Sequence, residues 1–373
     1  MKVVCLSFWY YDYTIQLANS IAKHVDKLML LLPSCTPKEY LDGVIKNGSL
    51  ELYCFTHPKR YVHRKLLVSI KEILRKIKDF NPDLIHIQAS NPLICLLLPL
   101  IKRRFPVITE LHDLRPHVGE ESFFYEMVLS FSRKYSDKII VHGQRMKEEL
   151  VREFGINGNK VSSIILAEHE VKPFLKYCKG DGVQEDNNTI LFFGRIVKYK
   201  GLRYLIEAEG IITKEIPDAK IIIAGNGDLR KAVGDDLIKM LKKKSFIVIN
   251  RFIPYSEGAK LFQKCSLVVL PYIEGSQSGV IYPAYAFKKP VVVTDVGSLP
   301  EIVDNGITGF VVAPRDSKAL AEKIILLLEN WKLRKKMGEN AYKKLKTDLS
   351  WDKISKEIVK IYEETLRDFK TVP

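Results

Sequence analysis

The 373-residue sequence predicts an α/β protein built from two doubly wound, parallel sheets that follow each other along the chain. In each half, short apolar runs typical of buried strands alternate with apolar residues at helical spacing, as in a parallel sheet covered by helices. This alternation lapses at about residues 166–188, where polar runs rich in Gly, Asp and Asn indicate a linker. We therefore expect a first domain at 1–178, a linker at 179–188 and a second domain at 189–350.

In the first domain, runs rich in Val, Ile and Leu predict the strands, and apolar residues at helical spacing predict the helices between them. The expected strands cover residues 3–7, 27–32, 50–55, 84–88, 107–110 and 138–141. The expected helices cover residues 15–24, 64–80, 93–103, 122–135 and 145–154.

The second domain repeats this pattern and ends in a separate helical segment. Its expected strands cover residues 189–193, 220–224, 246–250, 267–270 and 291–294. Its expected helices cover residues 202–215, 229–243, 257–263, 281–287 and 317–328. Residues 351–369 then carry apolar side chains at helical spacing, which predicts a final helix within 351–373.

Composition narrows the classes of function. No apolar run approaches the ~20 residues that span a bilayer, and the N-terminal run lacks the features of a signal peptide. The six cysteines are scattered without a Cys-x-x-Cys pair, which argues against a zinc site or a disulfide framework and favours the cytoplasm. The net charge of +15 favours anionic partners such as nucleotides or phospholipids, or else reflects thermophile-like surface lysines. No nucleic-acid-binding motif accompanies the charge.

A basic loop follows the first strand of the second domain. The apolar run ends at Gly194, and the loop carries Arg195, Lys198 and Lys200 before it closes on Gly201 and a helix begins. Cations and glycines between a strand and a helix suit a phosphate or diphosphate group. A turn whose cations are merely solvated is the alternative, but the whole segment favours anion binding.

Further candidate ligand groups lie where later strands end, because ligands of open α/β sheets bind at the carboxyl ends of strands. A Gly-Asn-Gly turn allows close backbone approach, and a Gln-Ser-Gly-Val run before a helix exposes backbone N–H groups. These candidates are Gly225, Asn226, Gly227, Gln277, Ser278, Gly279 and Val280. Glu274 lies just before the second run. Its carboxylate is either part of the site or a solvated group of the loop.

The basic loop resembles the diphosphate loop of retaining glycosyltransferases of family 4, which reads approximately Gly-Arg-x-x-x-x-Lys-Gly and is matched by Gly194, Arg195, Lys200 and Gly201. The run Val-Val-Val-Thr-Asp-Val-Gly-Ser-Leu-Pro-Glu at 291–301 is also similar to that family. The resemblance implies the GT-B fold, in which two Rossmann-like domains face a cleft. It also implies a UDP- or GDP-linked sugar donor on the second domain, an acceptor on the first, and a final helix that crosses back to the first domain.

The resemblance further implies roles for individual residues. Arg195 and Lys200 would stabilise the leaving diphosphate, and the backbone of Phe252 and Ile253 would hold the nucleobase. His112, in a His-Asp pair at a strand end, would contact the donor sugar near the reacting carbon. The chain departs from the family pattern at two places: Glu274 is shifted by about one position, and Pro283 stands where the family usually has a ribose-binding glutamate.

Two features of the first domain suggest where an acceptor binds. Aromatic residues in the loop after the first strand could stack on sugars, with packing inside the protein as the alternative. The acceptor candidates are Trp9, Tyr10, Tyr11, Asp12 and, secondarily, His117. The segment 64–80 places Lys65, Lys71, Arg75, Lys76 and Lys78 opposite an apolar stripe. Such a helix either lies on an anionic membrane that carries a lipid-linked acceptor or packs on the sheet.

The sequence therefore predicts a retaining, metal-independent hexosyltransferase that moves a sugar from a nucleotide-diphospho-sugar to a hydroxyl of a glycan, a lipid-linked compound or a small molecule. Metal independence is inferred from the basic loop and from the lack of an Asp-x-Asp motif. We expect a cytoplasmic protein, with peripheral binding to the inner face of the membrane as a hypothesis, no cofactor beyond the donor and no nucleic-acid partner. A nucleotide-sugar 2-epimerase or hydrolase, and a non-catalytic nucleotide-sugar-binding subunit, remain as alternatives.

Overall fold

The computed structural model describes residues 1–45, 48–57, 64–88, 91–116, 123–169, 171–178 and 184–371. The chain divides into two compact units. Unit 1 comprises Met1–Pro116, Glu120–Ala167 and Ser350–Pro373, and unit 2 comprises His117–Gly119 and Glu168–Leu349. The end of the chain therefore belongs to the first unit, and the main part of the second unit begins before the polar segment at 179–188.

Unit 1 is built on a parallel seven-stranded sheet with the order β3-β2-β1-β4-β5-β6-β7. Its strands are β1 (Lys2–Leu6), β2 (Lys27–Pro33), β3 (Leu50–Phe55), β4 (Leu84–Gln88), β5 (Val107–Leu111), β6 (Lys138–His142) and β7 (Val161–Ile164). The order reverses between β1 and β4, where open parallel sheets bind their ligands. Strands β4, β5 and β6 are buried at every position, although each carries two polar residues.

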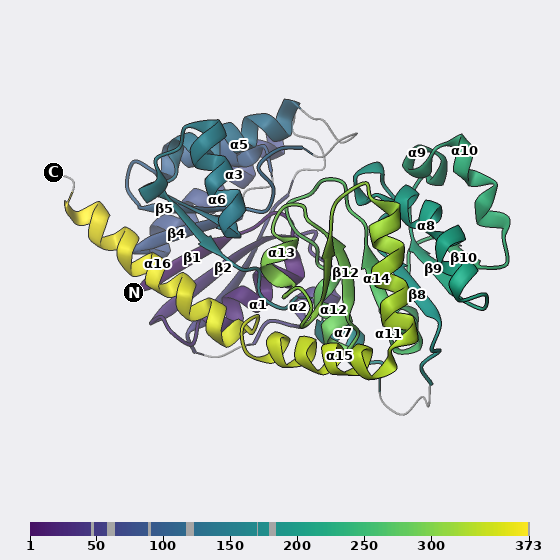
Figure 1. The fold of residues 1–373 in the computed structure, drawn as a ribbon. Helices are drawn as coiled ribbons and strands as arrows, with labels where there is room; N and C mark the ends of the chain where they lie inside the picture. Colours follow the sequence, from purple (N-terminus) through teal and green to yellow (C-terminus); the bar gives the residue numbers. More distant parts are fainter. Residues whose placement is uncertain are drawn as a thin grey trace. The chain divides into compact units, whose positions relative to one another are not determined.

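The helices of unit 1 connect its strands, and one of them comes from the end of the chain. They are α1 (Tyr11–Ile21), α2 (Lys38–Leu41), α3 (Arg64–Phe80), α4 (Leu93–Ile101), α5 (Phe123–Tyr135), α6 (Gln144–Phe154) and α16 (Trp351–Thr371), with a 3₁₀ turn at Gly158–Lys160. Helix α16, at the yellow end of the chain in Figure 1, packs against α1. Ser20 of α1 donates a hydrogen bond to the carbonyl oxygen of Trp351 at 3.1 Å, within a buried contact.

Unit 2 is built on a parallel six-stranded sheet with the order β10-β9-β8-β11-β12-β13. Its strands are β8 (Thr189–Phe193), β9 (Lys220–Gly225), β10 (Phe246–Asn250), β11 (Leu267–Leu270), β12 (Val291–Thr294) and β13 (Gly309–Val312). The order reverses between β8 and β11, so the two sheets share the doubly wound arrangement that the sequence predicts. The basic loop after β8 therefore leaves the sheet at its point of reversal.

The helices of unit 2 cover this second sheet. They are α7 (Val171–Leu175), α8 (Leu202–Glu215), α9 (Leu229–Val233), α10 (Asp235–Ile238), α11 (Tyr255–Lys264), α12 (Ile281–Ala286), α13 (Leu299–Ile302), α14 (Ser317–Glu329) and α15 (Trp331–Lys346), with 3₁₀ turns at Lys198–Lys200 and Met240–Lys242. Helices α8 and α14 pack against each other (Figure 1), and both contribute to one apolar core with β8 and β9.

Several elements differ from the sequence prediction, each for a local reason. The sequence does not predict the edge strands β7 and β13 or the lysine-rich helix α15. The two middle residues of each of these strands are only half-buried. The single helix predicted at 229–243 is wrong, because Gly234, at φ 90°, separates α9 from α10. Helix α1 begins at Tyr11 rather than at residue 15, and the N-cap residue Tyr10 has a left-handed backbone with φ 55°.

Candidate functional site

The loops after β8 and β9 are joined at the carboxyl edge of the unit 2 sheet. The N–H of Gly194 donates to the carbonyl of Ala224 at 3.0 Å, and the N–H of Ile196 donates to the carbonyl of Asn226 at 2.8 Å. A Cβ on Gly225 would lie 1.8 Å from the carbonyl oxygen of Gly194, and one on Gly227 would lie 2.0 Å from that of Ile196. These two glycines are therefore required by the contact between the loops, before any ligand is considered.

The loops after β11 and β12 extend the same edge. The N–H of Ile273 donates to the carbonyl of Tyr199 at 2.9 Å, which ties the β11 loop to the basic loop. The N–H of Ser298 donates to the carbonyl of Ser276 at 2.8 Å, which ties the β12 loop to the β11 loop. Backbone hydrogen bonds thus hold the four strand-end loops of unit 2 in one arrangement.

Lys200 lies at the centre of this arrangement. Its side chain is only 9% exposed, and its Nζ lies 5.2 Å from the centre of the Tyr272 ring. A Cβ built on Gly194 would stand 3.0 Å from Nζ of Lys200 and 3.6 Å from Cγ2 of Val280. The ammonium group, the glycine backbone and the residue before α12 therefore converge between the ends of β8 and β11. Among the described residues, no carboxylate oxygen lies within 4.0 Å of this ammonium group.

Arg195 occupies the outer side of the same loop. Its side chain is exposed, and its Nη2 donates to the hydroxyl oxygen of Tyr199 at 3.0 Å. Tyr199 itself is buried, 5% exposed, so its hydroxyl anchors one end of the Arg195 guanidinium. The loop therefore presents one cation that is nearly buried and a second that is held at the surface.

The segment before α12 contacts Tyr272, whose ring lies beside Lys200. The hydroxyl groups of Ser278 and Tyr272 lie 2.9 Å apart, and the N–H of Val280 donates to Ser278 Oγ at 3.3 Å. A Cβ on Gly279 would meet Nε2 of His169 at 2.6 Å. Glu274 and Gln277, in the same loop, are half-buried.

Pro283 is buried in the first turn of α12. The resemblance to family 4 would place a ribose-binding glutamate at this position. Proline is accommodated there because the N–H groups of a first helical turn have no partner within the helix. Position 283 therefore offers no carboxylate to a ligand.

Phe252 and Ile253 differ sharply in exposure. Phe252 is 76% exposed, whereas Ile253 is 8% exposed. Arg251, just before them, makes a two-pronged ion pair with Glu257 of α11, with both N–O distances at 2.8 Å. Asn250 and Gly227 exchange two hydrogen bonds, of 3.2 and 3.0 Å, so this loop also joins the strand-end assembly.

In unit 1, His112 lies at the end of β5 in a buried aromatic and polar cluster. It is 4% exposed, and its Nε2 lies 2.6 Å from Oε1 of Gln88. The Tyr10 ring stacks on the imidazole with centroids 4.0 Å apart, and the Tyr13 ring meets it edge-on at 5.3 Å. The imidazole is therefore held on its face, on its edge and at one nitrogen.

Glu110, one strand position from the end of β5, is the charged centre of this cluster. Tyr13 Oη and Gln88 Nε2 donate hydrogen bonds to its fully buried carboxylate at 2.5 and 2.6 Å. The imidazole nitrogens His86 Nε2 and His142 Nε2 lie 3.0 and 3.1 Å from the same carboxylate. Burial raises the pKa of this carboxyl group, but the contacts from His142 and His86 outweigh burial and hold the pKa well below its usual range. These contacts therefore favour the ionised form of Glu110.

Glu110, His112 and His142 also bring three possible metal-ligand atoms within 4.8 Å of one another. A carboxylate has about four lone-pair positions, and two hydrogen-bond donors and two imidazole nitrogens already lie within 3.1 Å of Glu110. A cation bound here would have to displace some of these groups. The cluster fits a network of hydrogen bonds and ion pairs better than a metal site.

The aromatic candidates after β1 are divided between a loop and a helix, rather than all lying in the loop that the sequence predicts. Trp9 is 51% exposed and Tyr10, 39% exposed, stacks on His112. Tyr11 and Asp12 lie in the first turn of α1, and Asp12 accepts a hydrogen bond from Gln16 at 2.8 Å. His117 lies outside the described residues.

Helix α3 packs its apolar stripe into the core of unit 1. Ile73 and Ile77 are buried there, while Lys71, Arg75 and Lys78 are exposed on the opposite side. The start of the helix departs from this pattern, since Leu67 and Val68 are 62% and 52% exposed. Within the described ranges, no helix has the length and apolar content to cross a membrane.

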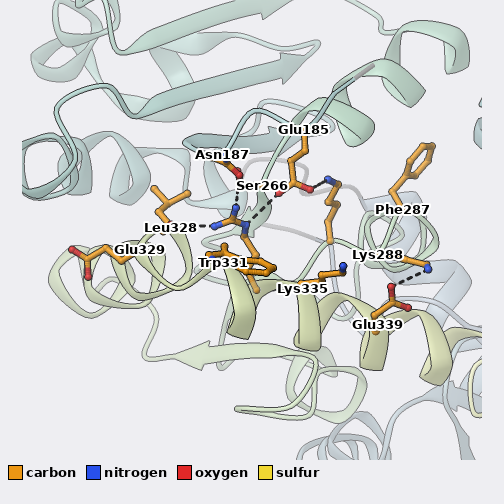
Figure 2. A pocket seen from close by; sticks show the side chains of 12 residues that line it. Glu185, Asn187, Ser266, Phe287, Lys288, Leu328, Glu329, Trp331, Lys335 and Glu339 are labelled. Carbon is orange, nitrogen blue, oxygen red and sulfur yellow. Dashed lines mark hydrogen bonds and ion pairs between the residues drawn. The ribbon is translucent and has the colours of Figure 1, made fainter. Parts of the chain in front are cut away.

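A separate pocket of about 780 Å³ opens in unit 2, away from the strand-end loops (Figure 2). Its wall is held by the buried guanidinium of Arg334, which donates to Glu185 and Asn187 at 3.3 and 2.9 Å. The same group donates to the carbonyls of Leu327 and Leu328 at 2.8 and 3.1 Å. Arg334 therefore caps the end of α14 and ties it to the residues that precede β8.

Gln88, Glu110 and His142 are not among the candidates that sequence reasoning identifies, although they surround His112. Each is a polar residue at or near the carboxyl end of a strand that is buried at every position. That position is the available signal, because strand ends of a doubly wound sheet meet at one edge. Tyr199 and Tyr272, which contact Arg195 and Lys200, carry no comparable signal.

Comparison with known proteins matches both halves of the chain. The family described as Glycosyltransferase Family 4 matches residues 13–164, and the family described as Glycosyl transferases group 1 matches residues 176–344. An uncharacterised glycosyltransferase of Methanocaldococcus jannaschii is 29% identical over 379 residues, covering 98% of each chain. A second one from that organism is 31% identical over 239 residues, which span 61% of this chain and 60% of the relative's length.

Among solved structures, the Anabaena protein HepE in complex with UDP-glucose has a TM-score of 0.70 and 18% sequence identity, covering 98% of this chain and 100% of HepE. This likeness concerns the fold, and it extends over both sheets. The two family models match the two halves of the chain, and the structural likeness covers both sheets. The chain is therefore a glycosyltransferase that belongs to group 1 of family 4 and has the GT-B fold of two Rossmann-like domains.

Proposed function

We propose that this glycosyltransferase is a retaining, metal-independent hexosyltransferase that uses a nucleotide-diphospho-sugar and transfers the sugar to a hydroxyl group. The observation that carries the proposal is the position of Lys200. A cation that is 9% exposed and has no carboxylate partner among the described residues is costly unless a ligand neutralises it. A diphosphate bound over Gly194 would do so, and exposed Arg195 could close on its outer oxygens.

The other donor contacts follow from the arrangement of the loops. We assign the diphosphate to the backbone of Gly194 and Val280, with Gly225, Asn226 and Gly227 shaping the adjoining wall. Gln277, Ser278 and Gly279 would bind donor hydroxyl or phosphate oxygens. Exposed Phe252 and the backbone of Ile253 would meet the nucleobase. The complex of HepE with UDP-glucose supports UDP as the nucleotide, with GDP as the alternative.

The proposed chemistry relies on the leaving group. As the bond between sugar and diphosphate breaks, negative charge grows on the phosphate oxygens, and Arg195 and Lys200 stabilise it without a metal ion. The departing diphosphate then accepts the proton of the acceptor hydroxyl on the same face of the sugar, so no strong protein base is needed. His112 would stabilise the sugar near the reacting carbon, and Glu274 would contact the donor from the β11 loop. Trp9 and Tyr10 remain acceptor candidates.

The test is thermal stabilisation by UDP-, GDP-, ADP- and dTDP-sugars in the presence of a chelator. One nucleotide class should raise the melting temperature, and Lys200→Ala and Arg195→Ala should reduce this shift, because a ligand that binds the folded state less tightly stabilises it less. Lys198→Ala is the matched control, since Lys198 is an exposed lysine of the same loop, and it should keep the shift. A shift that survives in both variants, or that requires a divalent cation, would contradict the proposal.

Turnover then distinguishes the remaining alternatives. Transfer that depends on an added hydroxyl acceptor and retains the anomeric configuration, read by NMR, is the expected result. Release of nucleotide or change of the sugar without any acceptor would instead indicate a hydrolase or 2-epimerase. Donor binding without transfer across a broad acceptor panel would indicate a non-catalytic subunit.

We further propose that unit 1 binds peripherally to the inner face of an anionic membrane, where a lipid-linked acceptor would be available. The supporting feature is α3, whose exposed Leu67 and Val68 stand on the same helix as Lys71, Arg75, Lys76 and Lys78. Replacing the four cations by Gln should weaken binding to vesicles containing phosphatidylglycerol but not to neutral vesicles. Equal binding of the variant and the wild type to both vesicles would remove this proposal.

A further inference from the structure

A continuous line of buried polar contacts leads from helix α16 to His112. The hydroxyl of Tyr362 lies 2.6 Å from Nδ1 of His86, and Nε2 of His86 lies 3.0 Å from Oε2 of Glu110. The same Oε2 accepts a hydrogen bond from Nε2 of Gln88 at 2.6 Å, and Oε1 of Gln88 lies 2.6 Å from Nε2 of His112. All five side chains are at most 4% exposed. The line joins α16, β4 and β5 within unit 1.

The orientation of the Gln88 amide follows from the charge of Glu110. An ionised carboxylate accepts hydrogen bonds and cannot donate them. The NH₂ group of Gln88 must therefore face Glu110, since the reverse orientation would set two acceptors 2.6 Å apart. The depressed pKa of Glu110 agrees with an ionised carboxylate in this position. The amide oxygen of Gln88 is then left to face the imidazole of His112.

This orientation decides which nitrogen of His112 carries the proton. An acceptor oxygen 2.6 Å from Nε2 requires a hydrogen atom on Nε2. We propose that Glu110 and Gln88 are positioning residues that hold His112 as the Nε2–H tautomer, so that Nδ1 is the acceptor atom of the neutral ring. In the proposed mechanism, Glu110 does not contact the sugar. It acts on His112 through Gln88.

The surroundings of His112 make a single tautomer useful. The stacked ring of Tyr10 and the edge of Tyr13 restrict how the imidazole can rotate, so the tautomer also determines the direction in which an acceptor atom is presented. Second-layer hydrogen bonds of this kind orient functional histidines in other sites. The consequence for turnover rests on the proposed function, whereas the tautomer itself can be measured in the absence of any substrate.

The test uses Glu110→Gln, which keeps the shape of the side chain. The new amide can present an NH₂ group to Gln88, which allows Gln88 to turn its own NH₂ group toward His112. In ¹⁵N-histidine spectra of the full chain, assigned with His112→Asn, the wild type should have one His112 tautomer protonated at Nε2. Glu110→Gln should populate the Nδ1–H form. It should also lower kcat at least about tenfold, with a much smaller change in the donor KM, since a histidine in the wrong tautomer loses its catalytic role.

Two further variants keep the test decisive. Gln88→Met removes the acceptor and should give mixed tautomers even if Glu110→Gln folds poorly. Glu209→Gln is the matched control, because Glu209 is a 2% exposed carboxylate of unit 2 that pairs with Lys243 and Ser245 at 2.6 Å. It should lower stability without changing the His112 spectrum. An unchanged Nε2–H signal in folded Glu110→Gln and Gln88→Met would overturn this inference, even with transfer intact. Absence of transfer in the wild type would count against the proposed function alone.

Discussion

Gly201 lies directly against the carbonyl oxygen of Pro271. A Cβ at residue 201 would stand 1.9 Å from that oxygen, and the backbone of Gly201 is left-handed, with φ 63°. Both facts require glycine at this position. The contact sets how closely the basic loop after β8 approaches the loop after β11, and therefore where Lys200 is held.

Gly201→Ala is expected to destabilise unit 2 by about 2–4 kcal/mol, because the left-handed backbone and the overlap with Pro271 both become unfavourable. It should also weaken the stabilisation by a nucleotide sugar. Urea unfolding and thermal shifts measure the two effects. Gly210→Ala is the control: residue 210 lies in α8 with nothing within 4 Å of a new Cβ, so this change should add up to about 1 kcal/mol of stability. Similar stabilities for the two variants would contradict the expectation.

Arg334→Ala should destabilise the protein by about 3 kcal/mol or more. The guanidinium is 4% exposed and satisfies two helix-end carbonyls as well as Glu185, so its removal leaves buried acceptors without donors. Arg334→Lys should rescue little, because an ammonium group cannot reproduce the fork of donors. Lys335→Ala, at an exposed position on the rim of the same pocket (Figure 2), should change stability by less than about 0.5 kcal/mol. Chemical denaturation measures the unfolding free energies of the three variants, and equal values for Arg334→Ala and Lys335→Ala would contradict this expectation.

The stabilising effect of Glu110 should depend on pH in a defined direction. Its pKa is depressed in the folded protein, so its contribution is fully present above the ordinary glutamate value of about 4.3 and is lost as the pH falls through the folded pKa. The difference in unfolding free energy between the wild type and Glu110→Gln should therefore be largest near neutral pH and shrink below about pH 4. A difference that stays constant from pH 7 to the acid limit of folding would show that Glu110 is not an anion in the native state.

Thiol labelling of the native protein should be selective. Burial raises the pKa of Cys5 and Cys265 to about 12 and that of Cys95 to about 11, so few thiolates form at these sites at pH 8. Cys35 is exposed and should react first with a maleimide, as located by peptide mass spectrometry. In urea, all six cysteines should react. Early modification of Cys5 in folded protein would mean that the core of unit 1 opens more readily than its packing indicates.

The sequence alone predicts both parallel sheets and most of their strands because these strands are buried on both faces and appear as continuous apolar runs. It misses β7 and β13, which lie at sheet edges and are only half-buried. It misses α15 because the helix is rich in lysine and its buried positions include Arg334, Gly338 and Ala341, which give little apolar signal. It joins α9 and α10 because the break depends on one glycine conformation, that of Gly234.

The candidate site divides in a similar way. The residues of the basic loop are contiguous, so Arg195 and Lys200 are predicted from their own spacing. The environment of His112 is assembled from α1, β4, β5 and β6, and no local pattern joins Tyr13, Gln88, Glu110 and His142. The sequence also assigns Gly225 and Gly227 to a ligand, whereas contacts with Gly194 and Ile196 already require them. A glycine motif indicates close backbone approach but not what approaches.

The packing of α16 against α1 has a consequence for how the protein is made. Unit 1 needs residues 350–371, yet the ribosome delivers them only after all of residues 168–349. At 5–20 residues per second, the first sheet waits roughly 10–40 s for its last helix, with the surface that α16 covers exposed to the cell. Unit 2, whose main part is one continuous stretch of chain, can fold during that interval. We expect nascent chains halted before residue 350 to recruit chaperones through the first unit rather than the second.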